Sequence, residues 1–273
     1  MLRVTLTSLA LGLLSFTSPH SSAVDAAAPV TVSDVSTAIA VNASALSFSE
    51  KEAAFDDHIL DIYNETNLKQ KGLSFEVFKN GVVGFQNFKR QHLNASDKSI
   101  LTVIDFTKSS RDKRLWIIDL KSKKLLFNTL VAHGRNTGED KAVKFSNQPN
   151  SYMSSLGFYL TDATYFGKHG LSLRLNGMDG KYNSNAMARA IVMHGADYAT
   201  SDFVKRYGRL GRSLGCPAVP QEFSKEIITA IKDKTVIYIH GNDSRYTSDY
   251  LNPKQAVETF ALEHSAAATM AAI

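Results

Sequence analysis

Residues Ile191–Pro220 read IVMHGADYATSDFVKRYGRLGRSLGCPAVP and contain the only cysteine of the 273-residue chain, Cys216. The apolar run Ala190–Met193 predicts a buried strand that ends at His194. Gly215 precedes the cysteine, and glycine permits the tight turn on which a nucleophile is exposed. Because a neighbouring imidazole helps a thiol to ionise, we predict that Cys216 is a nucleophile and His194 its base.

Both residues also have a structural interpretation. A lone cysteine is usually an inert, small hydrophobic side chain, and a lone histidine usually supports the fold. The glycine before Cys216, the strand-end position of His194 and an export signal favour the catalytic interpretation.

Residues 1–23 have the pattern of a secretory signal peptide. Met1–Arg3 is short and basic, Val4–Phe16 is almost wholly apolar, and Ser21–Ala23 supplies small residues for cleavage. The apolar core is shorter than the about 20 residues of a membrane-spanning helix. We expect the mature protein to begin near Val24, in the periplasm or the extracellular space, without stable membrane insertion.

If the protein is exported, a single cysteine is unusual. Structural cysteines in oxidising compartments normally come in pairs. A single cysteine is accidental, forms an intermolecular disulfide or is kept as a reactive thiol, and the residues around Cys216 favour the last.

The formal net charge of +5 is spread along the chain. It suits an anionic wall polymer, and without a basic stripe we expect no nucleic-acid binding.

The segment before the strands is predicted to be helical. Residues 24–49 are rich in Ala, Ser, Thr and Val and predict a linker, with a frayed helix over 33–45 as the alternative. Residues 50–98 predict two amphipathic helices, which begin at Ser49 and Ser74. We expect their aromatic side chains to pack on the main domain; lining a substrate groove is the alternative.

From Ser99 the apolar residues follow the period of strands. Strands are predicted at 100–106, 115–120, 124–132, 157–160, 171–175 and 235–240. A helix is predicted from Pro220, because proline favours the first helical position. Short strands joined by turns favour an all-β or mixed sandwich over parallel βαβ units. We assign 99–241 to the catalytic domain and 242–273 to a C-terminal tail, with a helix near 253–263.

The motif residues also resemble a known family. His194-Gly195 followed by Ser213-x-Gly215-Cys216 resembles the active-site signature of the L,D-transpeptidase catalytic domain of the YkuD type. The longer strings HGAxY and GRLGRSxGCPAxP resemble an exported subgroup of that family. The resemblance implies a mixed α+β, β-rich catalytic sandwich or barrel, here with an N-terminal helical segment. It implies no metal and no organic cofactor.

The resemblance implies a reaction on peptidoglycan stem peptides, both donor and acceptor. Cys216 attacks the donor to give a thioester, and an acceptor amine resolves it to a cross-link; resolution by water gives a carboxypeptidase. The carbonyl of Gly195 is implied to hold the second ring nitrogen of His194. Asp197 and Asp202 are the alternative partners, as acids of a triad.

Oxyanion binding is expected from the backbone N–H groups of Gly215 and Cys216. Pro217 cannot donate and stiffens the turn. Ser213 is expected to bond to the turn or to the substrate.

Substrate contacts are expected from four further residues. Arg209 and Arg212 lie in a basic segment, and arginine binds carboxylates in a bidentate manner, although a solvated loop is the alternative. Tyr198 is expected to shape the rim. His133 is expected to contact the donor peptide or to be structural.

The chain departs from the family pattern at Leu214, where many members carry histidine, and at Pro217-Ala218. Another cysteine amidase or peptidase of the envelope and a non-catalytic wall-binding protein are therefore alternatives. A zinc site is a further alternative, although the spacing of its four candidate ligands matches no compact motif. These are His133, His169, His194 and His240.

Overall fold

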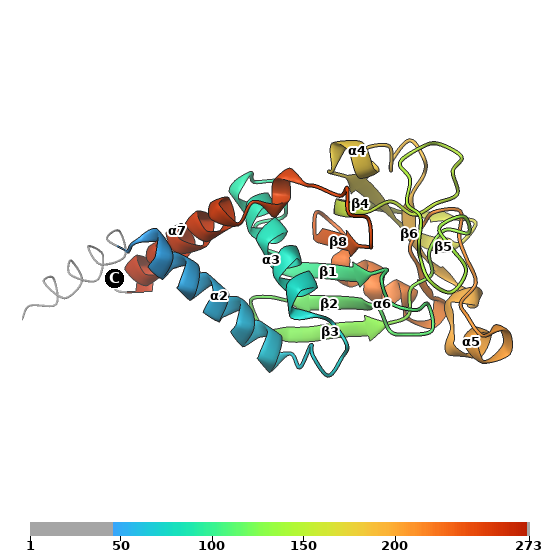
Figure 1. Cartoon of the computed structure of the whole chain (residues 1–273), viewed down its shortest axis with the longest axis horizontal. Coiled ribbons are helices and arrows are strands. Elements are labelled where there is room, and N and C mark those ends of the chain that lie inside the picture. Colours follow the sequence, from blue (N-terminus) through green and yellow to red (C-terminus); the bar gives the residue numbers. More distant parts are fainter. Residues whose placement is uncertain (1–45, 272–273) are drawn as a thin grey trace, which may run out of the picture.

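The computed structural model describes residues 46–271, which form a mixed α+β structure around one eight-stranded sheet (Figure 1). The strand order is β3-β2-β1-β8-β4-β5-β6-β7. This confirms the predicted fold class. The predicted signal peptide and most of the predicted linker lie outside the described residues. The strands are β1 Ile100–Asp105, β2 Leu115–Asp119, β3 Lys124–Thr129, β4 Gly157–Gly167, β5 Gly170–Gly177, β6 Val192–Ala196, β7 Ala218–Pro220 and β8 Val236–His240.

The sheet is mixed and almost closes on itself. The pairs β1–β8 and β6–β7 are parallel, and the other neighbours are antiparallel. Beyond β3, the N–H of Ala132 donates to the carbonyl of Ala218 at 2.8 Å, and Gly134 forms a bridge with Ser213. The two ends of the strand order therefore meet beside the segment that carries Cys216.

Helices cover the sheet at several places. They are α2 Phe48–Glu65, α3 Phe75–Arg90, α4 Gly180–Asn183, α5 Ser201–Tyr207, α6 Gln221–Ile231 and α7 Pro253–Ala271, with the short 3-10 helices η1 Asp197–Ala199 and η2 Asp249–Leu251. Among residues 46–271, no helix has both the length and the apolar character needed to cross a membrane.

The two predicted N-terminal helices are present, with one correction. Helix α2 is capped by Ser47 rather than Ser49, because Ser47 and Glu50 form a reciprocal capping box. Ser74 caps α3 as predicted, accepting from the N–H of Val77 at 3.3 Å.

Helix α7 extends well beyond the predicted 253–263. It lies beside α2 at the end of the molecule away from α5 (Figure 1). The rings of Phe55 and Phe260 are 5.1 Å apart, and Lys51 and Glu258 form an ion pair at 2.9 Å. Helix α7 thus packs against the helical layer. The division of the chain into 50–98, 99–241 and 242–273 stays a prediction.

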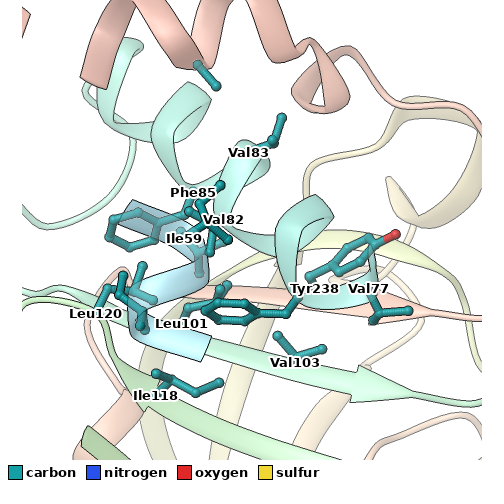
Figure 2. Close-up of a cluster of buried hydrophobic side chains, with 14 of the residues drawn as sticks. Ile59, Val77, Val82, Val83, Phe85, Leu101, Val103, Ile118, Leu120 and Tyr238 are labelled. Carbon is teal, nitrogen blue, oxygen red and sulfur yellow. The ribbon is translucent and has the colours of Figure 1, made fainter. Parts of the chain in front are cut away.

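The central strands are covered on both faces, which explains their nearly continuous apolar sequence. On β8, Val236 and Tyr238 pack toward the helical layer, and Ile237 and Ile239 pack into the interior of the sheet. Figure 2 shows Val82 of α3 above Leu101 and Tyr238, which come from the neighbouring strands β1 and β8. The helical layer therefore stabilises the sheet on the face away from α6.

Several element boundaries differ from the prediction, and β3 ends at Thr129 instead of residue 132. The β4–β5 hairpin extends to Gly167 and Gly170, because its outer part is exposed and lacks the apolar signal. Strand β7 was missed because it has three residues. Pro220 ends β7 and is the N-cap of α6, so the helix begins one residue later. His194 lies in the middle of β6, not at its end.

Gly84 allows α3 to approach the sheet, and Gly84→Ala is expected to destabilise the protein. A Cβ there would lie 2.1 Å from two ring carbons of Phe158. We expect a loss of about 1–3 kcal/mol in the free energy of unfolding, measured by urea denaturation. Gly180→Ala is the control, because a Cβ added there would have no atom within 4 Å. Equal stability of the two variants would contradict this packing.

Candidate active site

The parallel pairing of β6 and β7 brings the two motif segments together. His194 lies opposite Ala218 in this ladder, and Cys216 precedes Ala218 by two residues. His194 and Cys216 both line a cavity of about 430 Å³. Hollows of about 590 and 720 Å³ occur elsewhere, but neither is lined by a cysteine or a histidine.

The imidazole of His194 is buried and oriented by its neighbour. Its Nδ1 lies 2.8 Å from the carbonyl oxygen of Gly195, so Nδ1 carries the proton and donates. This leaves Nε2 free to accept a proton. Burial lowers the pKa of His194, the positive charges of His169 and Lys168 add to this, and the Gly195 carbonyl opposes it. The ring is therefore neutral at pH 7, as a base must be.

Gly215 sets the turn before the cysteine. Its φ of +126° favours glycine, and a Cβ would lie 2.8 Å from the carbonyl oxygen of Met153. The sulfur of half-buried Cys216 accepts from the N–H of Val192 at 3.5 Å and lies 3.7 Å from the carbonyl oxygen of Ala190.

The thiol of Cys216 is not hydrogen-bonded to His194 in this structure, so its ionisation by the imidazole stays a prediction. Within residues 46–271, no hydrogen bond joins Sγ of Cys216 to the ring of His194. Burial raises the pKa of Cys216, and the N–H of Val192 and the charges of Arg189 and Lys168 oppose this increase. A raised pKa of the thiol and a lowered pKa of His194 both disfavour a thiolate–imidazolium pair before substrate binds.

Alkylation of Cys216 should therefore depend on pH. Only the thiolate reacts, and we expect the rate constant for iodoacetamide to rise with pH through the neutral and alkaline range. Its midpoint should lie above that of the same chain in urea, where the thiol is solvated. A rate constant that stays flat from about pH 5 to 8 would indicate a thiolate–imidazolium pair instead.

Ser213 stabilises the cysteine turn. Its Oγ donates to the carbonyl oxygen of Cys216 at 2.6 Å and accepts from the N–H of Gly215 at 3.0 Å. The N–H of Gly215 is thus bonded to Ser213 in this structure and would have to exchange that partner for an oxyanion. The expected oxyanion role of the Gly215 and Cys216 N–H groups stays a prediction.

The two predicted arginines are held by one carboxylate. Arg209 and Arg212 pair with Glu139 at 3.0 and 2.6 Å. Of the two, only Arg212 lines the cavity. Lys168, whose segment Lys168-His169-Gly170 is a weaker sequence candidate of the same kind as His133, lines it as well, and so does Arg189. Among the described residues of the lining there is no carboxylate, so the cavity is positively charged.

Arg189 gives no sequence signal beyond its place shortly before β6. Its guanidinium donates to the carbonyl oxygens of Ser146 and Met153 and to the hydroxyl of Ser151. These bonds fix a positive charge near the sulfur. The predicted rim residue Tyr198 also lines the cavity, and burial raises its pKa to about 12.

His133 does not reach the cavity. It is buried, its Nδ1 accepts from Arg114 at 2.7 Å, and its Nε2 donates to the carbonyl oxygen of Gly138 at 3.2 Å. Both nitrogens are occupied, so the structure supports the structural alternative. Burial, with the charge of Arg114, lowers the pKa of His133 to about 4.

The geometry supports none of three alternatives. These are Asp197 or Asp202 as the acid of a triad, the N-terminal helices as one side of a substrate groove, and a histidine zinc site. Asp202 is exposed and pairs with Lys205 at 2.9 Å, and Asp197 does not line the cavity. Residues 50–92 contribute nothing to the cavity lining. Over the part of the chain that the structure describes, no three His, Cys, Asp or Glu side chains gather as metal ligands.

Comparison with known proteins gives one family. The family model of the L,D-transpeptidase catalytic domain matches residues 69–240. A search of curated proteins finds no match.

Several solved structures are similar to this chain. One is an L,D-transpeptidase from Mycobacterium smegmatis, with 10% identity, a TM-score of 0.34, and coverage of 53% of this chain and 59% of that one. Another is the helical cell shape determining protein Pgp2 from Campylobacter jejuni, with 12% identity, a TM-score of 0.38, and coverage of 67% of this chain and 64% of that one. A third is an L,D-transpeptidase from Stackebrandtia nassauensis (13%, 0.33, 62% and 69%). This chain spans less than two thirds of the first two, and likenesses this distant carry no argument about its function.

Proposed function

The chain belongs to the L,D-transpeptidase catalytic-domain family, and from this we propose that it is a cysteine-dependent L,D-transpeptidase that acts on peptidoglycan stem peptides. One observation carries the proposal. The β6–β7 pairing places an oriented, neutral imidazole and the only thiol of the chain in one cavity. The exported subgroup stays a prediction.

In the proposed first step, Sγ of Cys216 attacks the carbonyl carbon of the third residue of a donor stem. The thiol proton passes to Nε2 of His194, because Nδ1 is bound to the Gly195 carbonyl. The C–N bond to the terminal D-residue then breaks, the leaving amine takes that proton, and a thioester remains. The sulfur must turn from Ala190 toward His194 for this step, and such contacts often form only with substrate bound.

In the second step an acceptor amine attacks the thioester. Its proton returns through His194 to the sulfur, which leaves as the thiol. The positive charges of Lys168, Arg189 and Arg212 suit a substrate with free carboxylates. Leu214 is 52% exposed on the lining where many relatives carry histidine, so the rim there offers apolar contact instead of a hydrogen bond.

Purified muropeptides test the reaction. Tetrapeptide muropeptides should lose their terminal D-residue and give cross-linked dimers, with Cys216→Ala inactive. Tripeptides without dimers would identify the L,D-carboxypeptidase alternative, and cleavage of casein would identify a peptidase. Binding to sacculi without any product would support a non-catalytic wall-binding protein and contradict the proposal.

We propose further that the protein is exported and works in the periplasm or outside the cell. The signal-peptide pattern of residues 1–23 supports this. The N-terminal sequence of protein recovered outside the cytoplasmic membrane should begin near Val24. Recovery in the cytoplasm with residues 1–23 intact would contradict it.

A further inference from the structure

Two histidine rings are stacked beside the cysteine. The centroids of His169 and His194 are 4.1 Å apart, with an interplanar angle of 17°. We propose that His169, at the tip of the β4–β5 hairpin, is a positioning residue that holds the ring of His194 in the plane needed to take the thiol proton. The inference rests on the proposed role of His194 as base.

His194 needs a second restraint. The bond from Nδ1 to the Gly195 carbonyl holds one nitrogen, but small rotations about the Cα–Cβ and Cβ–Cγ bonds can still tilt the ring plane. A parallel aromatic neighbour fixes the plane of the ring, and stacking adds attraction beyond the area that it buries. The hydrogen bond and the stack together aim Nε2 in one direction.

The turn of the β4–β5 hairpin places His169 beside His194. Gly167 pairs with Gly170, so Lys168 and His169 form the two-residue turn, and Gly170 has a φ of +73°. The following strand, β5, pairs with β6 so that Ser172 lies opposite His194. The ladder that positions His194 therefore also positions the tip above it.

His169 has no evident role in the fold. It is exposed, and across residues 46–271 its ring makes no hydrogen bond; the stack on His194 is the ring contact that it makes. An exposed turn residue can be replaced without unfolding the domain. Variants at this position thus test the site rather than stability.

The surroundings disfavour a proton on either ring. The titratable groups of the cavity are Lys168 and Tyr165 on the hairpin, Arg189 before β6, Tyr198 on η1, and Arg212 and Cys216 in the following loop, with no carboxylate among the described lining residues. Burial lowers the pKa of His194 and of His169, and nearby positive charge adds to both effects. The stack therefore carries at most one proton near neutral pH.

The test compares His169→Ala, which removes the stack, with His169→Phe, which keeps an aromatic face. The first readout is the rate constant of Cys216 acylation by a carbapenem, followed by intact-protein mass. We expect His169→Ala to slow acylation about tenfold, and His169→Phe to stay within about threefold of the wild type. Phe166→Ala is the matched control, because this side chain is 84% exposed on the same hairpin and outside the cavity lining.

The second readout is the NMR titration of the His194 ring, assigned with His194→Gln. We expect the pKa of His194 to rise in His169→Ala, because the ring becomes more solvated and no second imidazole then competes with it for a proton. Wild-type rates and an unchanged pKa in His169→Ala, or equal slowing in His169→Phe, would overturn the inference. If the wild type itself is not acylated, the proposed function fails. The change in the His194 pKa between the wild type and His169→Ala then tests the positioning role of His169 by itself.

Discussion

Cys216→Ala is expected to lower the turnover of tetrapeptide muropeptides by at least about a thousandfold. Without the sulfur no thioester can form, and no second cysteine exists to replace it. The fold should be unaffected, because the side chain is half-buried and makes only weak hydrogen bonds to Val192 and Ala190. Product formation by chromatography and the melting temperature are measured on the same sample.

Wild-type protein with an alkylated thiol is the control, and it should be as inactive as Cys216→Ala. His194→Gln should also lose most of its turnover, because glutamine cannot take the thiol proton. Turnover that survives in Cys216→Ala would assign the chemistry to another nucleophile and remove the basis of the proposed mechanism.

Arg114→Leu is expected to cost about 3–5 kcal/mol in the free energy of unfolding. The guanidinium is fully buried and donates to the carbonyl oxygens of Val131 and Lys108 and to Nδ1 of His133. Burial lowers its pKa to about 10, so it stays charged at neutral pH. Leucine would leave these three acceptors buried without a donor. Urea denaturation measures the loss.

Arg111→Leu is the matched control three residues away. Its side chain is exposed and pairs with Asp140 at 3.6 Å, so we expect a change below about 1 kcal/mol. Arg114 bonds to Val131 and His133, which flank Ala132, the residue that pairs with Ala218. Loss of these bonds in Arg114→Leu should therefore also weaken the turn before Cys216. Equal stability of the two variants would show that the buried bonds contribute nothing.

Most of the strands and helices could be predicted from the sequence, because their apolar residues repeat with a clear period. The core strands β1, β2 and β8 follow such runs, and so do α2, α3 and α6. Strand β7 could not be predicted, since three residues carry no period. The extent of α7 was missed because its alanine-rich end resembles a tail, while its packing partners lie on α2 and α3, far away in the sequence.

The site could be predicted in part. The motif supplied Cys216, His194 and Gly195, and the cavity contains the first two, with the carbonyl of Gly195 on Nδ1. Their catalytic roles stay predictions. Lys168 and His169 lie on the turn of the β4–β5 hairpin, which the pairing of β5 with β6 brings to the cavity. Arg189 lies in the loop before β6, where its bonds to Ser146, Ser151 and Met153 hold it. The protonation of the thiol depends on burial, which the sequence does not encode locally.

The most direct measurement is the mass of the folded protein after incubation with a carbapenem, followed by mapping of the modified peptide. We expect one covalent adduct per chain, on the peptide that contains Cys216, and none in His194→Gln over the same time. A folded protein that stays unmodified, or an adduct on any other residue, would contradict the assignment of Cys216 as the nucleophile.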